Sequence, residues 1–140
     1  MDELGRGERT MTKYLTLSGM RRSVMEELAR DRLKTMQITS PHNFFAIMKL
    51  NTGDLVFLTD ESPEDVNRKT QGIVAQVRSR QISMQRFYHV DASGSEEREV
   101  LSARLQLEKK FVAIVKVVEH GDLGMPMIVE AERVLSYHAL

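Results

Sequence analysis

A basic segment in the middle of the chain has the residue types and the spacing needed to bind phosphate. No Asp or Glu occurs between Val66 and Val90. The basic side chains inside this segment are Arg68, Lys69, Arg78, Arg80 and Arg86. If Arg78 and Arg80 lie two apart on one strand, their guanidinium groups project from one face about 7 Å apart. This resembles the distance between successive phosphates, and arginine can hold a phosphate through two parallel hydrogen bonds.

Aromatic side chains next to the basic segment extend this interpretation to nucleic acid. Phe87, Tyr88 and His89 follow Arg86 directly and could stack on unpaired bases. The alternative is that the arginines pair with Glu residues on a neighbouring strand, since exposed cross-strand ion pairs are common. The chain has 20 basic and 20 acidic residues, so no overall field draws it to nucleic acid. The sequence leaves both interpretations open.

Other kinds of site have little support in the residues. The four histidines, His42, His89, His120 and His138, lack the i+3 or i+4 spacing that would place two imidazoles on one helical face. The chain has no cysteine, no GxSxG elbow and no GxGxxG or Walker-type loop. The acidic cluster from Asp60 to Asp65 lacks the spacing of a calcium loop and is typical of a capped helix start. We therefore predict no catalytic residue, no metal and no cofactor.

Length and composition predict an ordinary globular domain. A chain of 140 residues with 41% hydrophobic and 29% charged residues is normally one domain with its own core. We predict a flexible N-terminal tail at residues 1–10, which are polar, and a single domain at residues 11–140. No apolar run approaches the roughly 20 residues that span a bilayer, which predicts no membrane partner. The absence of cysteine fits a reducing compartment, so we predict a cytoplasmic protein.

One main helix and two short helical segments are predicted. Met20, Val24 and Leu28 recur at i, i+4 and i+8, with Ser18 placed to cap the helix. The charged residues that we expect on its solvated faces are Arg21, Arg22, Glu26, Glu27 and Arg30. Residues 42–49, after Pro41, are compatible with either a short helix or a strand, and the spacing of their apolar residues does not decide between the two. The sequence from Ser62 to Asp65 has the form of a capping box, which predicts one helical turn.

Short apolar segments predict about seven strands and a curved sheet. The expected strands are Tyr14–Leu17, Thr35–Thr39, Leu55–Thr59, a long strand from Gly72, Leu101–Leu107, Phe111–Val118 and one that begins at Met127. Leu55–Thr59 is apolar on both faces and therefore central. In the long strand the apolar residues change from odd to even positions before Ile82, which predicts a bulge or a bend. A loop is expected from Asp91 to Ser95, and a turn at Glu108-Lys109-Lys110. We predict an α+β fold, a small, mixed, partly closed β-barrel with one main helix and short helical turns.

The order of these segments resembles the PUA-like superfamily, especially its ASCH branch, over roughly Tyr14 to Arg80. The similarity lies in Lys34, in the Gly53-Asp54 turn before an apolar strand, and in Gln71-Gly72-Ile73-Val74-Ala75. Of the branch's GxKxxExR motif only Lys34 matches, because Arg32, Gln37 and Thr39 stand at its glycine, glutamate and arginine positions. The resemblance implies a barrel that binds RNA. One group of small members hydrolyses acylated nucleosides with a lysine, a threonine and a glutamate, of which only Lys34 can be placed.

The whole chain also resembles an uncharacterised archaeal family. The segments that carry this resemblance are Pro41-His42-Asn43-Phe44, Gly53-Asp54, Ser83-Met84-Gln85-Arg86 and Pro126-Met127-Ile128-Val129-Glu130. This similarity is closer than the first, and it implies no activity.

Three functional hypotheses follow from the sequence. The first is binding of RNA or a nucleotide-containing ligand in a basic cleft between the helix Met20–Asp31 and the strand after Gly72. The residues expected to line this cleft are Lys34, Gln37, Arg78, Arg80 and Arg86. The second is a non-catalytic interaction module that forms a homodimer through an exposed strand edge or a patch of methionines, of which the chain has nine. The third is hydrolysis of a modified nucleoside, which requires Lys34 to act as a base beside a carboxylate partner that the sequence does not identify.

Overall fold

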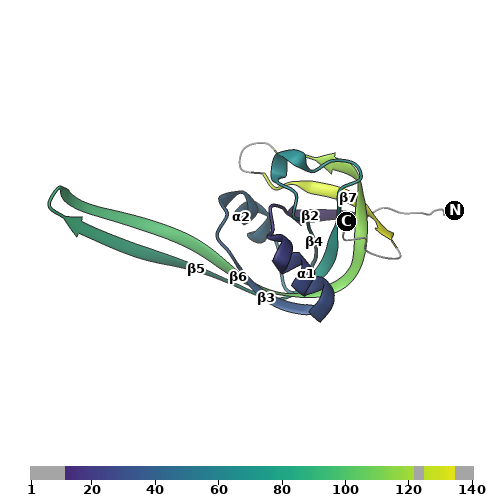
Figure 1. Cartoon of the computed structure of the whole chain (residues 1–140), viewed down its shortest axis with the longest axis horizontal. Helices are drawn as coiled ribbons and strands as arrows, with labels where there is room; N and C mark the ends of the chain where they lie inside the picture. Colours follow the sequence, from purple (N-terminus) through teal and green to yellow (C-terminus); the bar gives the residue numbers. More distant parts are fainter. Residues whose placement is uncertain (1–11, 122–124, 135–140) are drawn as a thin grey trace.

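A computed structural model of the chain describes residues 12–121 and 125–134 and shows a sheet-dominated fold (Figure 1). The elements in chain order are β2 (Thr12–Leu17), α1 (Arg22–Asp31), β3 (Leu33–Ile38), α2 (Pro41–Ile47), β4 (Leu55–Leu58), the 3-10 helix η1 (Pro63–Asp65), β5 (Gln71–Asp91), β6 (Gly94–Glu119) and β7 (Ile128–Val134). The predicted tail at residues 1–10 lies outside the described residues. Within the described residues, no helix has the length and apolar character needed to cross a membrane.

All the described strands belong to one mixed sheet, in which β7 pairs both with β2 and with β6, while β3 pairs only with β6. The strand order is β3-β6-β5-β4-β2-β7, and an additional pairing joins β6 to β7. β6 is long enough to pair with β3 along residues 103–108 and with β7 along residues 112–119. β2 and β4 are parallel, and the other pairs are antiparallel. The structure therefore confirms the α+β class and a sheet that is partly ring-like.

The long strands β5 and β6 bend at bulges. The pairing register shifts between Val74 and Ala75 and again between Val77 and Ser79. The second shift lies between Val77 and Ile82, where the apolar residues change from odd to even positions, and it confirms the predicted bulge. The predicted turn at Glu108-Lys109-Lys110 is wrong. Lys109 pairs with Ala75 and Phe111 pairs with Val74, so Lys110 is the extra residue of a bulge and the strand continues. Two predicted strands are thus one, and the described residues contain six strands.

Residues 83–101, hereafter the arm, project from the rest of the molecule as a two-stranded ribbon (Figure 1). β5 and β6 stay paired out to Asp91 and Gly94, so the loop predicted at Asp91 to Ser95 is reduced to a two-residue turn. The Asp91 carboxylate accepts hydrogen bonds from the Ser93 amide at 2.9 Å and from the Ser93 hydroxyl at 2.6 Å. β4 pairs with β5 only along residues 73–76, and β3 reaches only residue 103 of β6. No strand of the described residues therefore pairs with either edge of the arm.

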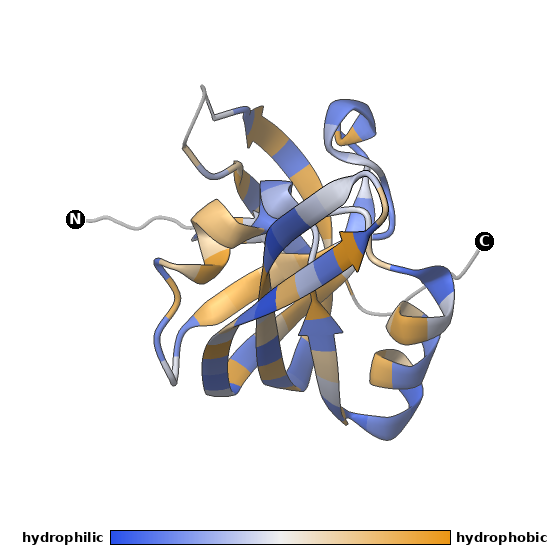
Figure 2. Cartoon of the chain, turned by 90° about the vertical axis from the view of Figure 1, so that its left-hand side faces the viewer, coloured by the Kyte–Doolittle hydropathy of each residue, from blue (hydrophilic) through white to orange (hydrophobic). Residues whose placement is uncertain are grey.

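Buried side chains form two clusters on the two faces of the sheet. The larger cluster joins α1 and α2 to the sheet through residues such as Leu28 and Ile47. The smaller one lies on the opposite face. β4 contributes Val56 and Leu58 to the larger cluster and Phe57 to the smaller one, which confirms the prediction of a central strand that is apolar on both faces. Figure 2 shows the hydrophobic and hydrophilic residues that alternate along the surrounding strands.

The two α-helices and the 3-10 helix can be compared with the helical segments predicted from the sequence. The ambiguous segment 42–49 lies largely in α2, which starts at Pro41 and buries Ala46 and Ile47 against the core. The prediction that Ser18 caps the first helix is wrong, because α1 starts at Arg22 and its N-cap residue is Arg21. The predicted helical turn after Ser62 is present as η1, although the Ser62 hydroxyl bonds the Asp65 carboxylate at 2.8 Å instead of a backbone amide.

Candidate ligand-binding pocket

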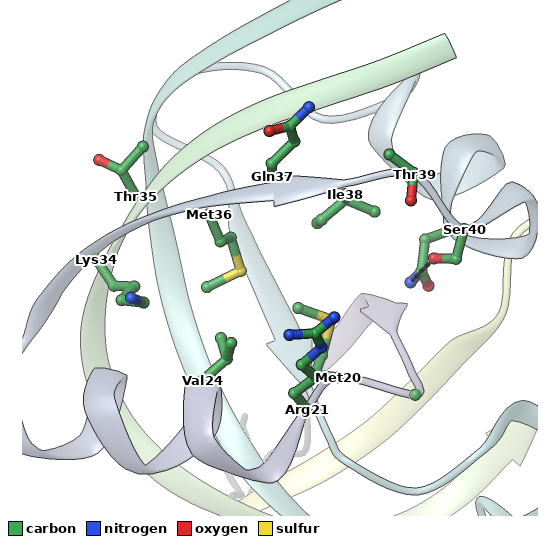
Figure 3. A pocket seen from close by; sticks show the side chains of 12 residues that line it. Met20, Arg21, Val24, Lys34, Thr35, Met36, Gln37, Ile38, Thr39 and Ser40 are labelled. Carbon is green, nitrogen blue, oxygen red and sulfur yellow. Dashed lines mark hydrogen bonds between the residues drawn. The ribbon is translucent and has the colours of Figure 1, made fainter. Parts of the chain in front are cut away.

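A depression between the first turn of α1 and β3, hereafter the α1–β3 pocket, has a volume of about 500 Å³ (Figure 3). Its size falls in the range that accommodates small ligands. The lining residues are Gly19, Met20, Arg21, Val24, Lys34, Thr35, Met36, Gln37, Ile38, Thr39, Ser40 and Asn43. This set contains two cationic side chains and no carboxylate.

Alternation along β3 gives the pocket its mixed character. Met36 and Ile38 are buried and lie on the same side of β3 as α1, where Val24 points toward Met36 (Figure 3). Gln37 lies on the other side of the strand and is exposed. β3 is the last strand of the sheet, so one of its edges faces the pocket without a neighbouring strand. The pocket therefore combines an apolar floor with polar groups along an open strand edge.

Asn43 fixes the loop that leads into α1. The side-chain oxygen of Asn43 accepts a hydrogen bond from the Ser18 amide at 3.0 Å, and its nitrogen donates to the Ser18 carbonyl at 3.0 Å. The same nitrogen donates to the Ser40 hydroxyl at 2.9 Å. Asn43 is 2% exposed, so these bonds are shielded from water. They hold Gly19 to Arg21 beside α2 and so fix one wall of the pocket.

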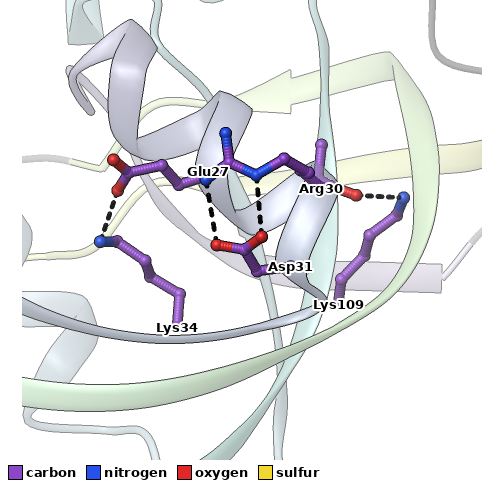
Figure 4. Close-up of polar contacts among 6 residues, drawn as sticks. Glu27, Arg30, Asp31, Lys34 and Lys109 are labelled. Atoms are coloured by element: carbon purple, nitrogen blue, oxygen red, sulfur yellow. Dashed lines mark hydrogen bonds and ion pairs between the residues drawn. The ribbon is translucent and has the colours of Figure 1, made fainter.

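The charged groups around α1 are partly neutralised by one another (Figure 4). The Lys34 ammonium contacts the Glu27 carboxylate at 2.5 Å, and the Lys109 ammonium donates to the Ala29 carbonyl near the end of α1. Arg30 beside Asp31 lowers the pKa of that carboxyl, because its guanidinium stabilises the charged form. Arg21, by contrast, has no ion pair or hydrogen bond from its side chain to any described residue, and it is exposed. Arg21 is therefore the cation best able to contact a ligand in the pocket.

The structure brings only two of the five predicted site residues to the α1–β3 pocket. Lys34 and Gln37 line it. Arg78 forms an ion pair with Glu108 at 3.3 Å, and Arg86 forms one with Glu99 at 3.0 Å on the arm. Arg80 donates a hydrogen bond to the Ile47 carbonyl at 2.9 Å at the C-terminal end of α2.

The expectation that Arg78 and Arg80 project side by side is not met. The bulge between Val77 and Ser79 adds Arg78 to the strand as an unpaired residue, whereas Arg80 lies opposite the buried Leu105. The alternation of faces is interrupted at the bulge, so residues two apart no longer share a side of the strand. Arg78 consequently reaches Glu108 on one face and Arg80 reaches α2 on the other.

Sequence reasoning misses three residues that the structure places at or beside this site. The sequence predicts Arg21 on a solvated helix face, but it precedes α1 and lines the pocket. Asn43 makes the hydrogen bonds that hold the Ser18 backbone. Its position in the Pro41-His42-Asn43-Phe44 segment, which carries the family resemblance, is the feature of the sequence that could have identified it. Arg104 lies opposite Gln37 on β6, in a pairing that no local pattern reveals.

No group of three or more potential metal ligands occurs in the described part of the chain. His42 and His120 do line one small depression of about 250 Å³, together with apolar residues such as Phe45 and Met127. Two imidazoles without a third ligand do not make a zinc site.

The fold and the pocket together define a small, sheet-dominated α+β domain with an open depression lined by Arg21 and Lys34. The chain belongs to the family described as "Protein of unknown function (DUF473)", whose family model matches residues 12–129. It is 30% identical over 111 residues to "Uncharacterized protein MJ0105" of the archaeon Methanocaldococcus jannaschii, covering 79% of this chain and 68% of that protein. This confirms the predicted membership of an uncharacterised archaeal family.

A solved structure, "N terminal domain of Mycobacterium avium complex Lon protease", aligns with the chain at a TM-score of 0.47 and 13% sequence identity. The alignment covers 92% of this chain and 58% of that chain.

Proposed function

We propose that this protein binds RNA, or a ligand that contains a nucleotide, in the α1–β3 pocket. The observation that carries the proposal is the charge of the lining, which has Arg21 and Lys34 but no Asp or Glu. The chain as a whole has as many acidic as basic residues, so this local excess of positive charge is not a by-product of composition. Arginine and lysine are the side chains that recognise phosphate.

The end of α1 at the pocket supports an anionic ligand. The first turn of α1 contains no acidic side chain, and the N-cap residue Arg21 makes no side-chain capping hydrogen bond. The partial positive charge at a helix N-terminus therefore adds to that of Arg21, whereas the charge of Lys34 is partly neutralised by Glu27.

The apolar floor supports a ligand with a flat, weakly polar part. Met20, Val24, Met36 and Ile38 line the pocket beneath the cations. A nucleobase can lie against such a surface while its phosphate meets the charged rim. The resemblance to the PUA-like superfamily, which implies RNA binding on a barrel, agrees with this arrangement.

The test is binding of fluorescently labelled single-stranded and structured RNA at low salt, measured by polarisation. We expect binding that weakens steeply as salt rises, because phosphate contacts release counterions. Replacing Arg21 or Lys34 by alanine should weaken it about tenfold or more and should reduce the salt dependence. Absence of binding to any RNA or nucleotide at low salt would overturn the proposal.

A set of matched arginine variants locates the binding surface. Arg98→Ala, on the arm, removes an exposed arginine outside the pocket and should leave binding unchanged. Arg78→Ala and Arg86→Ala test the wider basic cleft expected from the sequence. If they weaken binding as much as Arg21→Ala, the ligand follows β5 and does not lie in the α1–β3 pocket.

The arm favours self-association as a second candidate function. Its exposed apolar side chains include Met84, Phe87, Tyr88, Val90 and Leu101. An isolated two-stranded ribbon is only marginally stable in water, and unpaired edges promote pairing with a second copy. Light scattering across micromolar concentrations tests this, with Phe87→Ser and Tyr88→Ser combined as the variant. A wild-type protein that stays monomeric throughout would exclude the homodimer.

The contact between Lys34 and Glu27 supplies the carboxylate partner that the hypothesis of modified-nucleoside hydrolysis requires. The sequence identifies no carboxylate partner for Lys34, and α1 supplies Glu27 next to it. Incubation with N-acylated nucleosides is the test, comparing the wild type with Lys34→Ala and Glu27→Gln. Turnover that is absent, or unchanged by Lys34→Ala, removes the catalytic assignment of Lys34.

A further inference from the structure

A second depression of about 300 Å³, hereafter the Arg104 groove, lies at the base of the arm. All the residues that line it are polar: Gln37, Gln81, Ser83, Gln85, Ser102 and Arg104. They come from three neighbouring strands, β3, β6 and β5. A groove without apolar side chains suits a ligand that binds by hydrogen bonds and charge and not by burial of hydrophobic surface.

The register of the sheet explains how the groove is built. Gln37 on β3 and Gln81 on β5 are both paired with Arg104 on β6. The Cβ atoms of residues directly opposite one another lie on the same face, about 5 Å apart, so the Arg104 side chain leaves the sheet between those of two glutamines. In the next row the hydroxyls of Ser83 and Ser102 hydrogen-bond to each other at 3.1 Å, and these short side chains leave room above them.

Arg104 is chemically available, unlike the arginines predicted from the sequence. Arg78 and Arg86 are each held by a glutamate, and Arg80 is held by α2. Arg104 is exposed and its side chain forms no ion pair or hydrogen bond with any described residue. No carboxylate lines the groove. An arginine with free donors among neutral amides is arranged to bind an anion, and phosphate fits its two parallel donors.

The Arg104 groove adjoins the α1–β3 pocket at Gln37. Gln37 lines both depressions, so the two share a wall formed by β3. A ligand that leaves the pocket over the free edge of β3 meets Arg104 on the next strand, about 5 Å further on. The cations at the two ends of this path are Arg21 and Arg104.

We propose that the Arg104 groove binds a second phosphate of a single-stranded RNA whose first nucleotide occupies the α1–β3 pocket. This inference rests on the proposed function and deepens it, because it selects a polymer over a mononucleotide. The amides of Gln37, Gln81 and Gln85 add hydrogen-bond donors and acceptors that can meet the sugar, the phosphate oxygens or a base edge. The ligand chain then runs across the sheet from α1 toward the arm.

The experiment is a length series, measured by titration calorimetry at low salt. The probes are uridine 5′-monophosphate and 5′-phosphorylated oligouridylates of two, four and eight nucleotides. We expect the wild-type affinity to rise about tenfold or more between one and four nucleotides, since the longer probes can reach Arg104. Arg104→Ala should abolish this rise and leave the affinity for the mononucleotide unchanged.

Matched controls separate this inference from the proposed function. Arg98→Ala removes an arginine from the same strand and the same face, nearer the tip, and should preserve the rise with length. The thermal midpoint of Arg104→Ala should equal that of the wild type, because the side chain makes no internal bond. Equal affinity for all lengths, or an undiminished rise in Arg104→Ala, would overturn the inference while leaving the mononucleotide site intact. If no probe binds, the proposed function itself fails.

Discussion

The strands β5 and β6 run through both the arm and the body of the molecule, which is the described part of the chain outside residues 83–101, yet their side chains lie in opposite environments in the two regions. In β5, residues 72–75 and Val77 are buried, whereas every residue of the strand from Ser83 to Asp91 is exposed. The body part of β5 has β4 on one side and β6 on the other. The arm part has only β6 beside it. The difference shows that strand pairing alone suffices to extend β5, but burial requires further strands and helices.

The exposure of aromatic side chains differs between the body and the arm. Phe57 in β4 is fully buried, while Phe87 and Tyr88 in the arm are 49% and 70% exposed. Hydrophobic side chains contribute to stability in proportion to the surface that they remove from water. The body therefore carries the stability of the fold, and the arm displays apolar and charged groups to its surroundings.

The largest expected effect is the loss of a body aromatic. Phe57→Ala removes a fully buried ring from the smaller cluster, so we expect a loss of about 3–5 kcal/mol in the free energy of unfolding. Phe87→Ala, the matched change on the arm, should alter it by no more than about 0.5 kcal/mol. Urea denaturation of both variants measures the difference. Equal losses would show that the arm is packed against other groups in solution.

The junction between body and arm should show an intermediate effect. Arg80 donates to the Ile47 carbonyl at 2.9 Å and to the Met48 carbonyl at 3.3 Å, which ties β5 to the end of α2. Arg80→Ala should lower the free energy of unfolding by about 1–2 kcal/mol, because the helix carbonyls lose a charged donor. Arg78→Ala, which breaks an exposed ion pair with Glu108, should cost less than about 1 kcal/mol. Thermal unfolding compares the two, and a larger loss for Arg78→Ala would contradict the assignment.

A cross-strand ion pair on the arm should contribute less to the free energy of unfolding than the Arg80 hydrogen bonds do. Arg86 and Glu99 lie opposite each other and their charged groups are 3.0 Å apart, but both side chains are about half exposed. Arg86→Ala should lower the free energy of unfolding by no more than about 0.5 kcal/mol, and 1 M salt should remove the difference because exposed charges are screened. Denaturation at low and high salt checks this. A loss that persists in high salt would indicate a contact other than the ion pair.

The smallest effect is a local one at the tip of the arm. The Asp91 carboxylate accepts two hydrogen bonds from Ser93, which lower its pKa below the ordinary value of 3.8. The stabilisation of the turn is therefore complete above pH 3.8 and is lost as the pH falls through the lowered pKa. NMR signals of Ser93 and Gly94 should shift in this range while those of the body stay constant.

The replacement of this carboxylate is the control for the pH effect. Asp91→Asn keeps an acceptor oxygen but cannot titrate, so its tip signals should not change with pH. An Asp91 carboxyl that titrates at or above pH 3.8 would show that the turn bonds do not persist in solution.

Several parts of the fold follow from local sequence alone. The apolar stripe of Val24 and Leu28 gives α1, and the alternation from Leu101 to Leu107 gives part of β6. The two-sided apolar strand β4 is also readable from its residues, because a strand apolar on both faces must be covered on both. Membership of the family follows from short segments such as Pro41-His42-Asn43-Phe44. These features depend on residues close together in the chain.

The sequence did not determine which charged residues are available at a site. Arg78, Arg80 and Arg86 have the residue type and spacing of a phosphate-binding strand, but a bulge and three separate partners engage them. Arg21 and Arg104 lie 83 positions apart in the numbering and carry no motif, yet β3 brings their two depressions together through Gln37. Local propensity sets whether a segment is helix or strand, whereas the pairing register sets which side chains meet. Register depends on residues far apart in the chain, so only the tertiary structure decided which cations are paired and which are free to bind.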